Sequence, residues 1–364
     1  MIRFDLRDIL LGALLVQSGC GTKAASTASP GPSDDVGSSA RVVVYKFQDV
    51  PLPTDYDLGR ATHVVDAFLV PGIDGGLWAG DPQQSFLSVV RTDRDRAHEA
   101  GAAFMISVGG SAEMPDGLVK LAVDPQARRR FVHDVVQLCL DEHLDGVDID
   151  WENWPDDGAV DPIESGSFGD LMAALFPALK ANGLVLSAAV GPSDWYGRQI
   201  PANAFDNVDW LNVMAYEFSG EWSQWIGHHA GYRDSVASLA YWTGRGAANS
   251  KLMLGVPFFG VSFDGTRIGD RVTGPGPLGW TMTYSQIAAG MAAGQYGPIQ
   301  HDPATGAYVT AAHEITFFND GEDLKRKAAL ITEQGYGGMM IWELSQDADG
   351  PDSLLGTIAS SFRR

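Results

Sequence analysis

The sequence predicts an α/β fold built as a closed (β/α)₈ barrel. From residue 41 onward, short apolar segments alternate with longer helix-like stretches, which is the pattern of βα units around a parallel sheet. Eight strand candidates occur, and this favours a closed barrel over an open doubly wound sheet. One candidate carries acids on one face only, as a strand facing a barrel lumen would. These observations together indicate a TIM barrel.

The strand candidates are apolar runs bounded by turn residues, and they come at steady intervals. They are residues 41–47, 62–70, 103–108, 146–151, 184–190, 208–216, 251–259 and 338–342. Stretches with helical periodicity lie between most of them, for example at 125–142 and 320–334. We expect the catalytic or binding face at the carboxyl ends of these strands.

Residues 261–316 form a longer connection than a barrel needs between the seventh and eighth strands. Turn signals such as Asp264-Gly265 surround one possible short helix at 284–293. A Gly-Pro run at 274–277 is not a phosphate-binding loop, because proline lacks the backbone N–H that would hold a phosphate. We therefore predict a small insertion here.

The N-terminus has the features of a processing segment. Arg3 and Arg7 precede an apolar run at 9–16 that is too short to span a bilayer, and Ser18-Gly19-Cys20 follows. Residues 1–20 resemble a bacterial lipoprotein signal, in which Cys20 would carry a lipid anchor. Plain secretion and a cytoplasmic chain remain alternatives. Residues 21–40 are rich in Ser, Ala, Gly and Pro, which indicates a disordered linker.

Composition limits the classes of partner. The chain of 364 residues is 45% hydrophobic and carries a formal net charge of −21, which argues against nucleic-acid binding. The only cysteines are Cys20 and Cys139, so no intrachain disulfide can form once Cys20 is lipidated or removed. Cys139 is expected to pack as a small hydrophobe. We expect a monomer barrel over residues 41–364.

The segment 145–152 alternates acidic and apolar residues. On a strand, Asp148, Asp150 and Glu152 would share one face, while Val147 and Ile149 would share the other. Carboxylates crowded in a confined site cannot all ionise, because both repulsion and desolvation favour protonation. Glu152, at the rim end, is therefore predicted to hold a proton near neutral pH and to act as a general acid.

Two other interpretations of this segment are a solvated acidic strand face and a calcium site. A solvated face does not fit the parallel-sheet pattern around it. A calcium loop would need bending residues such as Gly or Asn between its ligands rather than Val and Ile. We expect no metal and no cofactor, since the neighbouring His228 and His229 lack a third ligand at useful spacing.

The segment Asp145-Gly146-Val147-Asp148-Ile149-Asp150-Trp151-Glu152 resembles the DGxDxDWE signature of glycoside hydrolase family 18, the chitinases and their relatives. Three more motifs resemble that family in the same order along the chain. They are Ser107-Val108-Gly109-Gly110, Met214-Ala215-Tyr216 and the closing segment Gly337-Gly338-Met339-Met340-Ile341-Trp342. One departure is Glu217, where the family commonly carries Asp.

The resemblance implies cleavage of β-1,4 bonds of N-acetylglucosamine polymers with retention, in which the substrate's own acetamide is the nucleophile. Glu152 would be the acid and base, Asp150 would stabilise the acetamide, and Asp148 would share a proton with Asp150. Tyr216 would position the acetamido oxygen. The expected sugar contacts are Trp342, Met214, Glu217, Tyr45, Ser107 and Trp154.

Aromatic residues favour a polymeric substrate, chitin or a chitooligosaccharide. Five of the ten tryptophans lie at or just after predicted strand ends, where they would line a cleft for an extended glycan. They are Trp154, Trp195, Trp222, Trp225 and Trp342. An endo-β-N-acetylglucosaminidase that acts on N-glycan cores and a non-catalytic chitin-binding lectin are the alternatives. Export to the outside of the cell or to a membrane surface follows from the N-terminal signal.

Overall fold

The computed structural model describes residues 40–47, 52, 56–77, 83–110, 117–152, 154 and 158–362. The signal-like segment, Cys20 and nearly all of the predicted linker lie outside these residues. Among the helices of the described part of the chain, none combines the length and apolar character that crossing a membrane requires.

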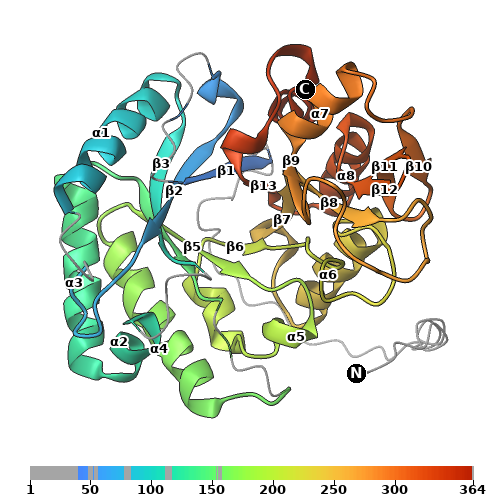
Figure 1. The fold of residues 1–364 in the computed structure, drawn as a ribbon. Coiled ribbons are helices and arrows are strands. Elements are labelled where there is room, and N and C mark those ends of the chain that lie inside the picture. Colours follow the sequence, from blue (N-terminus) through green and yellow to red (C-terminus); the bar gives the residue numbers. More distant parts are fainter. Residues whose placement is uncertain are drawn as a thin grey trace, which may run out of the picture. The chain divides into compact units, whose positions relative to one another are not determined.

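Eight parallel strands close into a barrel, which confirms the predicted fold class (Figure 1). Each strand of the first six pairs with its successor, and the last strand closes the ring between β7 and β1. The strands are β1 (Arg41–Phe47), β2 (His63–Leu69), β3 (Ala103–Gly109), β4 (Gly146–Asp150), β5 (Val185–Val190), β6 (Trp210–Val213), β7 (Leu252–Pro257) and β13 (Gly338–Trp342).

Two observed strands, β6 and β7, end earlier than the sequence predicts, because the chain changes direction directly after them. The sixth was expected to run to Tyr216, but β6 ends at Val213 because tight turns follow it: Ala215 N–H donates to Val213 and Tyr216 N–H to Met214. The seventh was expected to run to Phe259. There β7 ends at Pro257, and the chain enters a second sheet.

Helices surround the strands (Figure 1). Two of them, α3 and α4, begin with the same Asp-Pro signal: Asp124 and Asp161 accept hydrogen bonds from backbone N–H groups of the first turn, and a proline occupies the first helical position. The helices are α1 (Gln83–Glu99), α2 (Gly117–Val123), α3 (Pro125–Asp141), α4 (Pro162–Lys180), α5 (Asp194–Gly197), α6 (Tyr232–Gly244), α7 (Tyr284–Ala292), α8 (Gly321–Gln334) and α9 (Leu354–Phe362), with 3₁₀ turns at Leu58–Arg60, Ala202–Asn207, Asn249–Lys251, Leu344–Gln346 and Gly350–Asp352.

The predicted insertion forms an antiparallel five-stranded sheet beside β7 (Figure 1). Its order is β10-β11-β12-β8-β9, with bounds β8 (Phe259–Asp264), β9 (Thr281–Thr283), β10 (Gln300–Asp302), β11 (Gly306–Ala311) and β12 (Glu314–Phe317). The predicted short helix is α7, which starts with a reciprocal cap between Thr283 and Gln286.

Side chains alternate between the two faces of each barrel strand, so the buried apolar residues form two clusters, one between the strands and the helices and one in the lumen. Val147 and Ile149 of β4 pack outward with helix residues such as Phe131, whereas Tyr45 and Met340 fill the lumen. Cys139 is fully buried in the outer cluster, and burial raises the pKa of its thiol to about 12. It packs as the hydrophobe expected from the sequence.

Candidate active site

The acids of β4 line the barrel lumen as the alternation predicts. Asp148 and Asp150 are 0% and 3% exposed, and Glu152 follows the strand's carboxyl end, where it is partly exposed. On the opposite face, Trp151 is buried and its Nε1–H donates to Glu164 Oε1 at 2.8 Å. This hydrogen bond fixes Trp151, which lies between Asp150 and Glu152 in the sequence. It therefore holds the rim end of the three acids Asp148, Asp150 and Glu152, here called the acidic row.

Asp148 is held by hydrogen bonds from three other strands of the barrel. Ser187 Oγ donates to its Oδ1 at 2.6 Å, Asn212 Nδ2 to the same oxygen at 3.2 Å, and Ser107 Oγ to Oδ2 at 2.8 Å. Burial raises the pKa of Asp148, while these bonds and one from Tyr45 act in the lowering direction. The network fixes the carboxylate in one orientation.

Two members of this network are absent from the sequence-based prediction. Ser187 lies on β5 and Asn212 on β6, and both are fully buried. The signal that could have found them is a single polar residue at a lumen position of an otherwise apolar strand. Buried polar side chains need partners, and a lumen acid supplies one.

Asp150 is buried without comparable support. Its Oδ1 has no hydrogen-bond partner among the described residues. Burial, and then the charges of Glu152 and Asp148, raise its pKa well above the ordinary value. Asp148 and Asp150 are buried neighbours on one strand face and the pKa of each is raised, so the site disfavours ionisation of both at once.

Gly109 and Gly110 allow β3 to approach this acid closely. Gly110 N–H donates to the Asp150 backbone oxygen at 2.9 Å. Gly109 has φ 131°, and a Cβ there would lie 1.9 Å from the same oxygen. A side chain at position 109 is therefore incompatible with this arrangement.

The end of β6 contributes Tyr216 and Glu217. Tyr216 is 8% exposed and packs edge-on against Phe259, with ring centroids 6.1 Å apart. Burial and the nearby charges, Glu152 first, raise its pKa well above the ordinary value, so its hydroxyl stays protonated and can donate. Met214 is partly buried against the lumen cluster.

Trp342 ends β13 within an aromatic group. Its ring stacks on Phe68 at 5.8 Å and meets Tyr45 at 5.7 Å and Phe47 at 5.2 Å. The residue is partly exposed and borders a cavity of about 250 Å³. This leaves part of the indole available to a ligand. Phe68 stacks on the indole of Trp342, and no sequence motif identifies Phe68 as part of the site.

Three of the residues expected to contact the sugar, Ser107, Tyr45 and Trp154, are buried in the structure. Ser107 and Tyr45 are 0% and 1% exposed, and both hydrogen-bond within the Asp148 network, so they hold the acid in place. Trp154 is 6% exposed and stacks on Trp151 at 5.3 Å in the outer cluster. These contacts account for the three side chains within the protein, and their direct contact with a sugar stays a prediction.

Three other predicted cleft residues do expose their rings. Trp195, Trp222 and Trp225 are 52%, 62% and 55% exposed. Trp225 lies under the Arg271 guanidinium at 5.5 Å, which connects the segment after β6 to the insertion. These rings offer flat apolar surface outside the acidic lumen.

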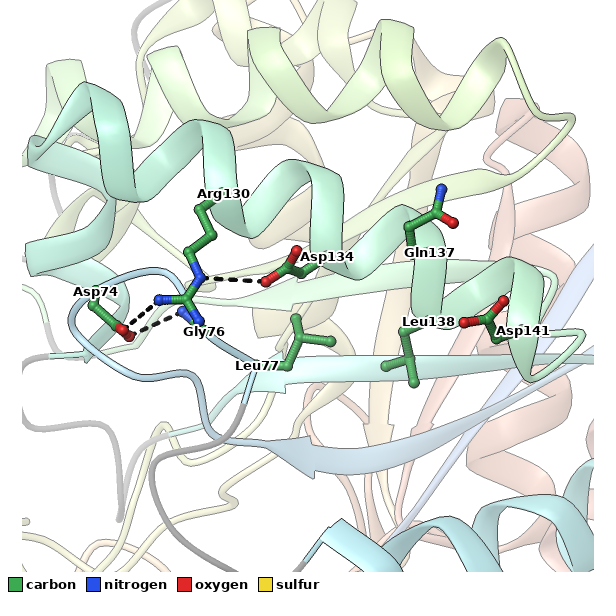
Figure 2. Close-up of a pocket in the computed structure, with 8 residues that line it drawn as sticks. All are labelled: Asp74, Gly76, Leu77, Arg130, Asp134, Gln137, Leu138 and Asp141. Carbon is green, nitrogen blue, oxygen red and sulfur yellow. Dashed lines mark hydrogen bonds and ion pairs between the residues drawn. The ribbon is translucent and has the colours of Figure 1, made fainter.

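A larger cavity of about 400 Å³ lies on the helical exterior (Figure 2). Its lining comes from the segment after β2 and from α3, where Arg130 bridges Asp74 and Asp134. None of the predicted site residues borders it. The lumen acids, not this cavity, remain the candidate site.

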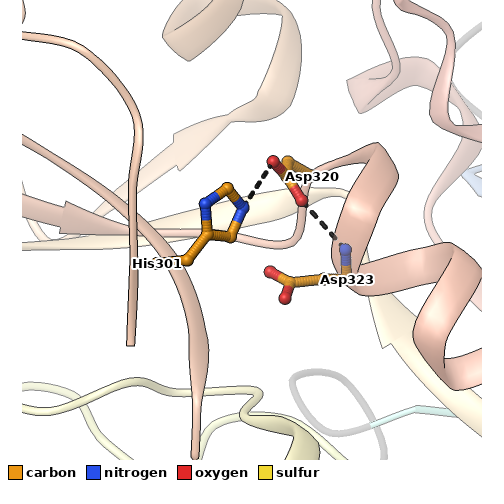
Figure 3. Close-up of side chains that lie close together, drawn as sticks. All are labelled: His301, Asp320 and Asp323. Carbon is orange, nitrogen blue, oxygen red and sulfur yellow. Dashed lines mark hydrogen bonds and ion pairs between the residues drawn. The ribbon is translucent and has the colours of Figure 1, made fainter. Parts of the chain in front are cut away.

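His301, Asp320 and Asp323 bring three potential metal ligands within 4.8 Å of one another (Figure 3). Each makes a structural hydrogen bond: Asp320 Oδ1 caps α8, Asp320 Oδ2 contacts His301 Nε2 at 2.9 Å, and Asp323 Oδ2 accepts from Ala307 N–H. The cluster joins the insertion sheet to α8, and the positive end of a helix disfavours a cation there.

Comparison with known proteins decides the family. The model of glycosyl hydrolases family 18 matches residues 41–347. The chain belongs to family 18. The match includes all of β1 to β13 and the complete acidic row, which confirms the family that the four motifs indicated.

Its relatives are named mainly as chitinases. The chain is 29% identical over 340 residues to the chitinase-like mite allergen Der p 18.0101 of Dermatophagoides pteronyssinus, covering 86% of this chain and 71% of the relative. It is 28% identical to endochitinase 1 of Metarhizium robertsii, covering 85% and 81%. The structure of a class V chitinase from Nicotiana tobaccum matches with a TM-score of 0.80 at 21% identity, covering 89% and 99%, and supports the shared fold.

Proposed function

We propose that this family 18 protein hydrolyses β-1,4 bonds of N-acetylglucosamine polymers with Glu152 as acid and base. The observation that carries the proposal is the acidic row, in which a fixed Asp148, an unsatisfied Asp150 and a partly exposed Glu152 rise toward the rim. Structures of the Nicotiana protein with NAG4 and of a Cycas revoluta class V chitinase with (GlcNAc)3 support an oligosaccharide ligand.

The first step breaks the glycosidic bond. Glu152 donates its proton to the glycosidic oxygen, while the acetamido carbonyl oxygen of the substrate attacks its own anomeric carbon and gives an oxazolinium ion. Asp150 Oδ1, which lacks a partner in the described residues, accepts the acetamide N–H and stabilises the positive charge that develops there. The Tyr216 hydroxyl donates to the acetamido oxygen and orients the attack.

The second step restores the enzyme. Glu152, now ionised, removes a proton from a water that attacks the anomeric carbon, the oxazolinium ring opens, and the product retains its configuration. Asp148 remains in its network throughout and exchanges a proton with Asp150 as the charge on the acetamide changes. Trp342 supports the sugar ring by stacking.

The test uses N-acetylglucosamine hexamer, wild-type protein and Glu152→Gln, with products read by mass spectrometry. Wild type is expected to release shorter oligomers, and the variant should be slower by about 10²–10⁴-fold because a general acid contributes that much. A hexamer that binds wild type and is never cut would favour a lectin. Cleavage confined to N-glycan cores would favour the glucosaminidase alternative.

We also propose that the protein is exported, with a lipid anchor at Cys20. The support is the basic and apolar sequence before Ser18-Gly19-Cys20. Mass spectrometry of the mature N-terminus from cells that make the full chain tests this. A mature chain that begins with diacylated Cys20 is the expected result, and an intact Met1 would refute export.

A further inference from the structure

The first two turns of α4 contact the chain on both sides of the proposed acid. Glu164 and Phe168 lie four residues apart in this helix, so their side chains share one face. Glu164 Oε1 accepts the Trp151 Nε1–H at 2.8 Å. The Phe168 ring meets the rings of Trp151 and Trp154 with centroids 5.6 Å and 5.7 Å away. This face of α4 therefore holds both tryptophans that flank Glu152 in the sequence.

The same two tryptophans hold the backbone of Glu152. Its carbonyl oxygen accepts the Trp154 N–H at 2.9 Å, and the rings of Trp151 and Trp154 stack at 5.3 Å with 20° between their planes. Trp151 and Trp154 are 1% and 6% exposed, whereas Glu152 is partly exposed at the rim. Two buried rings thus fix where the main chain of Glu152 lies, and the position of its carboxyl group follows from that.

Glu164 occupies a position from which a glutamate usually caps its own helix. The pattern at residues 161–164 is Asp-Pro-Ile-Glu, in which the first and last side chains would each accept the other's backbone N–H. Half of this cap is present, because Asp161 Oδ1 accepts the Glu164 N–H at 3.0 Å. The other half comes from Gln199, which is 1% exposed and whose Oε1 accepts the Asp161 N–H at 3.1 Å. The Glu164 carboxyl group is therefore free of its local role and binds Trp151 instead.

Local structure alone does not favour this arrangement of Glu164. The residue is 9% exposed, and burial raises the pKa of its carboxyl group, while the hydrogen bond from Trp151 acts in the lowering direction. A glutamate that capped the helix end would keep more of its hydration. Departures from a local rule are expected mainly at functional positions. Here the departure gives a contact with the residue next to the proposed acid.

We propose that Glu164 is a positioning residue for the proton transfer, because through Trp151 it sets the place of Glu152 at the barrel rim. The inference rests on the proposed function. A general acid must come within about 3 Å of the oxygen that it protonates, and a displacement of about 1 Å can lower the rate about 10²-fold. Glu164 contacts the outer side of β4, away from the lumen, so its loss should lower kcat and change KM little.

The first experiment measures kcat and KM for N-acetylglucosamine hexamer with wild type, Glu164→Ala and Glu164→Gln, well below the melting temperature of each protein. Glu164→Ala is expected to lower kcat about 10–10²-fold, with KM within about twofold of wild type. Glu164→Gln keeps an oxygen that can accept the indole N–H, so its kcat should stay within about threefold of wild type. An unchanged kcat in Glu164→Ala would overturn the inference.

Asp124→Ala is the matched control for stability. Asp124 is an exposed residue that caps a different helix, α3, by accepting the Gln126 N–H at 2.8 Å. Its loss should destabilise the fold by an amount similar to the loss of one hydrogen bond and leave kcat unchanged. An equal loss of kcat in this variant would mean that lowered stability explains the effect, and the positioning role would be wrong. If Glu164→Ala fails to fold, Glu164→Leu replaces it, because leucine fills the space without an acceptor.

A second measurement isolates proton donation. The nitrophenol of a nitrophenyl glycoside of the N-acetylglucosamine dimer departs with little help from an acid, whereas the sugar hydroxyl released from hexamer needs the proton. The value of kcat/KM, which reports the bond-breaking step, should therefore fall strongly in Glu164→Ala on hexamer and less than about threefold on the nitrophenyl glycoside. Equal losses on both substrates would contradict an effect through Glu152, since a loosened fold would slow both alike.

A double variant tests the route through Trp151. Trp151→Phe removes the indole N–H and so breaks the same hydrogen bond from the other side. If Glu164 acts through this bond, Glu164→Ala combined with Trp151→Phe should be no slower than Trp151→Phe alone. A double variant whose loss equals the product of the two single losses would show a separate route and refute the proposal.

The result for wild type separates this inference from the proposed function. If wild type cuts the hexamer and Glu164→Ala cuts it equally fast, the inference falls and the function stands. If wild type cuts neither substrate, the proposed function fails, and the positioning role of Glu164 fails with it.

Discussion

Replacement of Asp150 by asparagine is expected to make the protein more stable and nearly inactive. Asp150 is 3% exposed, and its Oδ1 has no hydrogen-bond partner in the described residues. A buried polar group without a partner costs about 1–3 kcal/mol, and more when charged. Asparagine is still a buried polar group of the same shape, but it carries no charge and needs no proton, so above about pH 4 unfolding of the variant should require about 1–3 kcal/mol more, which is roughly 2–5 °C in Tm for a barrel of this size.

The pH dependence gives a second signature of the same group. Burial and acidic neighbours raise the native pKa of Asp150 above the unfolded value of about 4. Between these two pKa values the native state binds more protons than the unfolded state, so stability falls as pH rises. The asparagine amide of the variant cannot titrate. The variant's advantage should therefore be small below about pH 4 and should grow as pH increases.

The assay is thermal unfolding of wild type, Asp150→Asn and Asp148→Asn between pH 4 and 8, with hexamer hydrolysis measured in parallel. Asp148→Asn is the matched control, because that carboxylate accepts hydrogen bonds from Ser107, Ser187 and Asn212 and should lose stability on replacement. Hydrolysis by Asp150→Asn should fall at least about 10²-fold. A variant that melts at or below the wild-type temperature at every pH would refute the account of Asp150.

Three further changes test the supports of the site. Ser187→Ala removes a 2.6 Å hydrogen bond to Asp148 and should destabilise the fold by about 1.5–3 kcal/mol in denaturant unfolding, whereas an unchanged midpoint would contradict the network. Gly109→Ala places a Cβ 1.9 Å from the Asp150 backbone oxygen and should lower stability by more than about 3 kcal/mol; normal folding would contradict the close approach. Trp342→Ala should raise the oligomer Kd about fivefold or more through lost stacking, measured by calorimetry, with an unchanged Kd as the opposing result.

The acidic row shows why part of the site could be predicted from sequence. Strand side chains alternate with a period of two, so residues 147–150 place Asp148 and Asp150 on one face whatever the rest of the fold does. The eight strands were recognisable for a similar reason, because a run buried on both faces is apolar throughout. The same logic misses Ser187 and Asn212, since a lone polar residue in a strand has no partner until the barrel closes.

Trp154 shows the limit of reasoning from position along the chain. It follows the fourth strand closely, which suggested the rim of the cleft. In the structure, Trp154 N–H donates to the Glu152 carbonyl at 2.9 Å, and the tight turn directs the indole onto Trp151 and Phe168. The direction of a side chain after a turn depends on local dihedral angles and on the cavity available to it, and neither has a sequence period.

By itself the sequence determined the barrel, the order of its strands, the acidic face of β4 and the family, because periodicity and short motifs are local properties of the chain. Only the tertiary structure decided which acid is satisfied and which is not. It also revealed that Ser107 and Tyr45 hold Asp148 and that Glu217 shares a pocket with the insertion. These are contacts between residues far apart in sequence, and their energies depend on burial and distance, which exist only once the chain has folded.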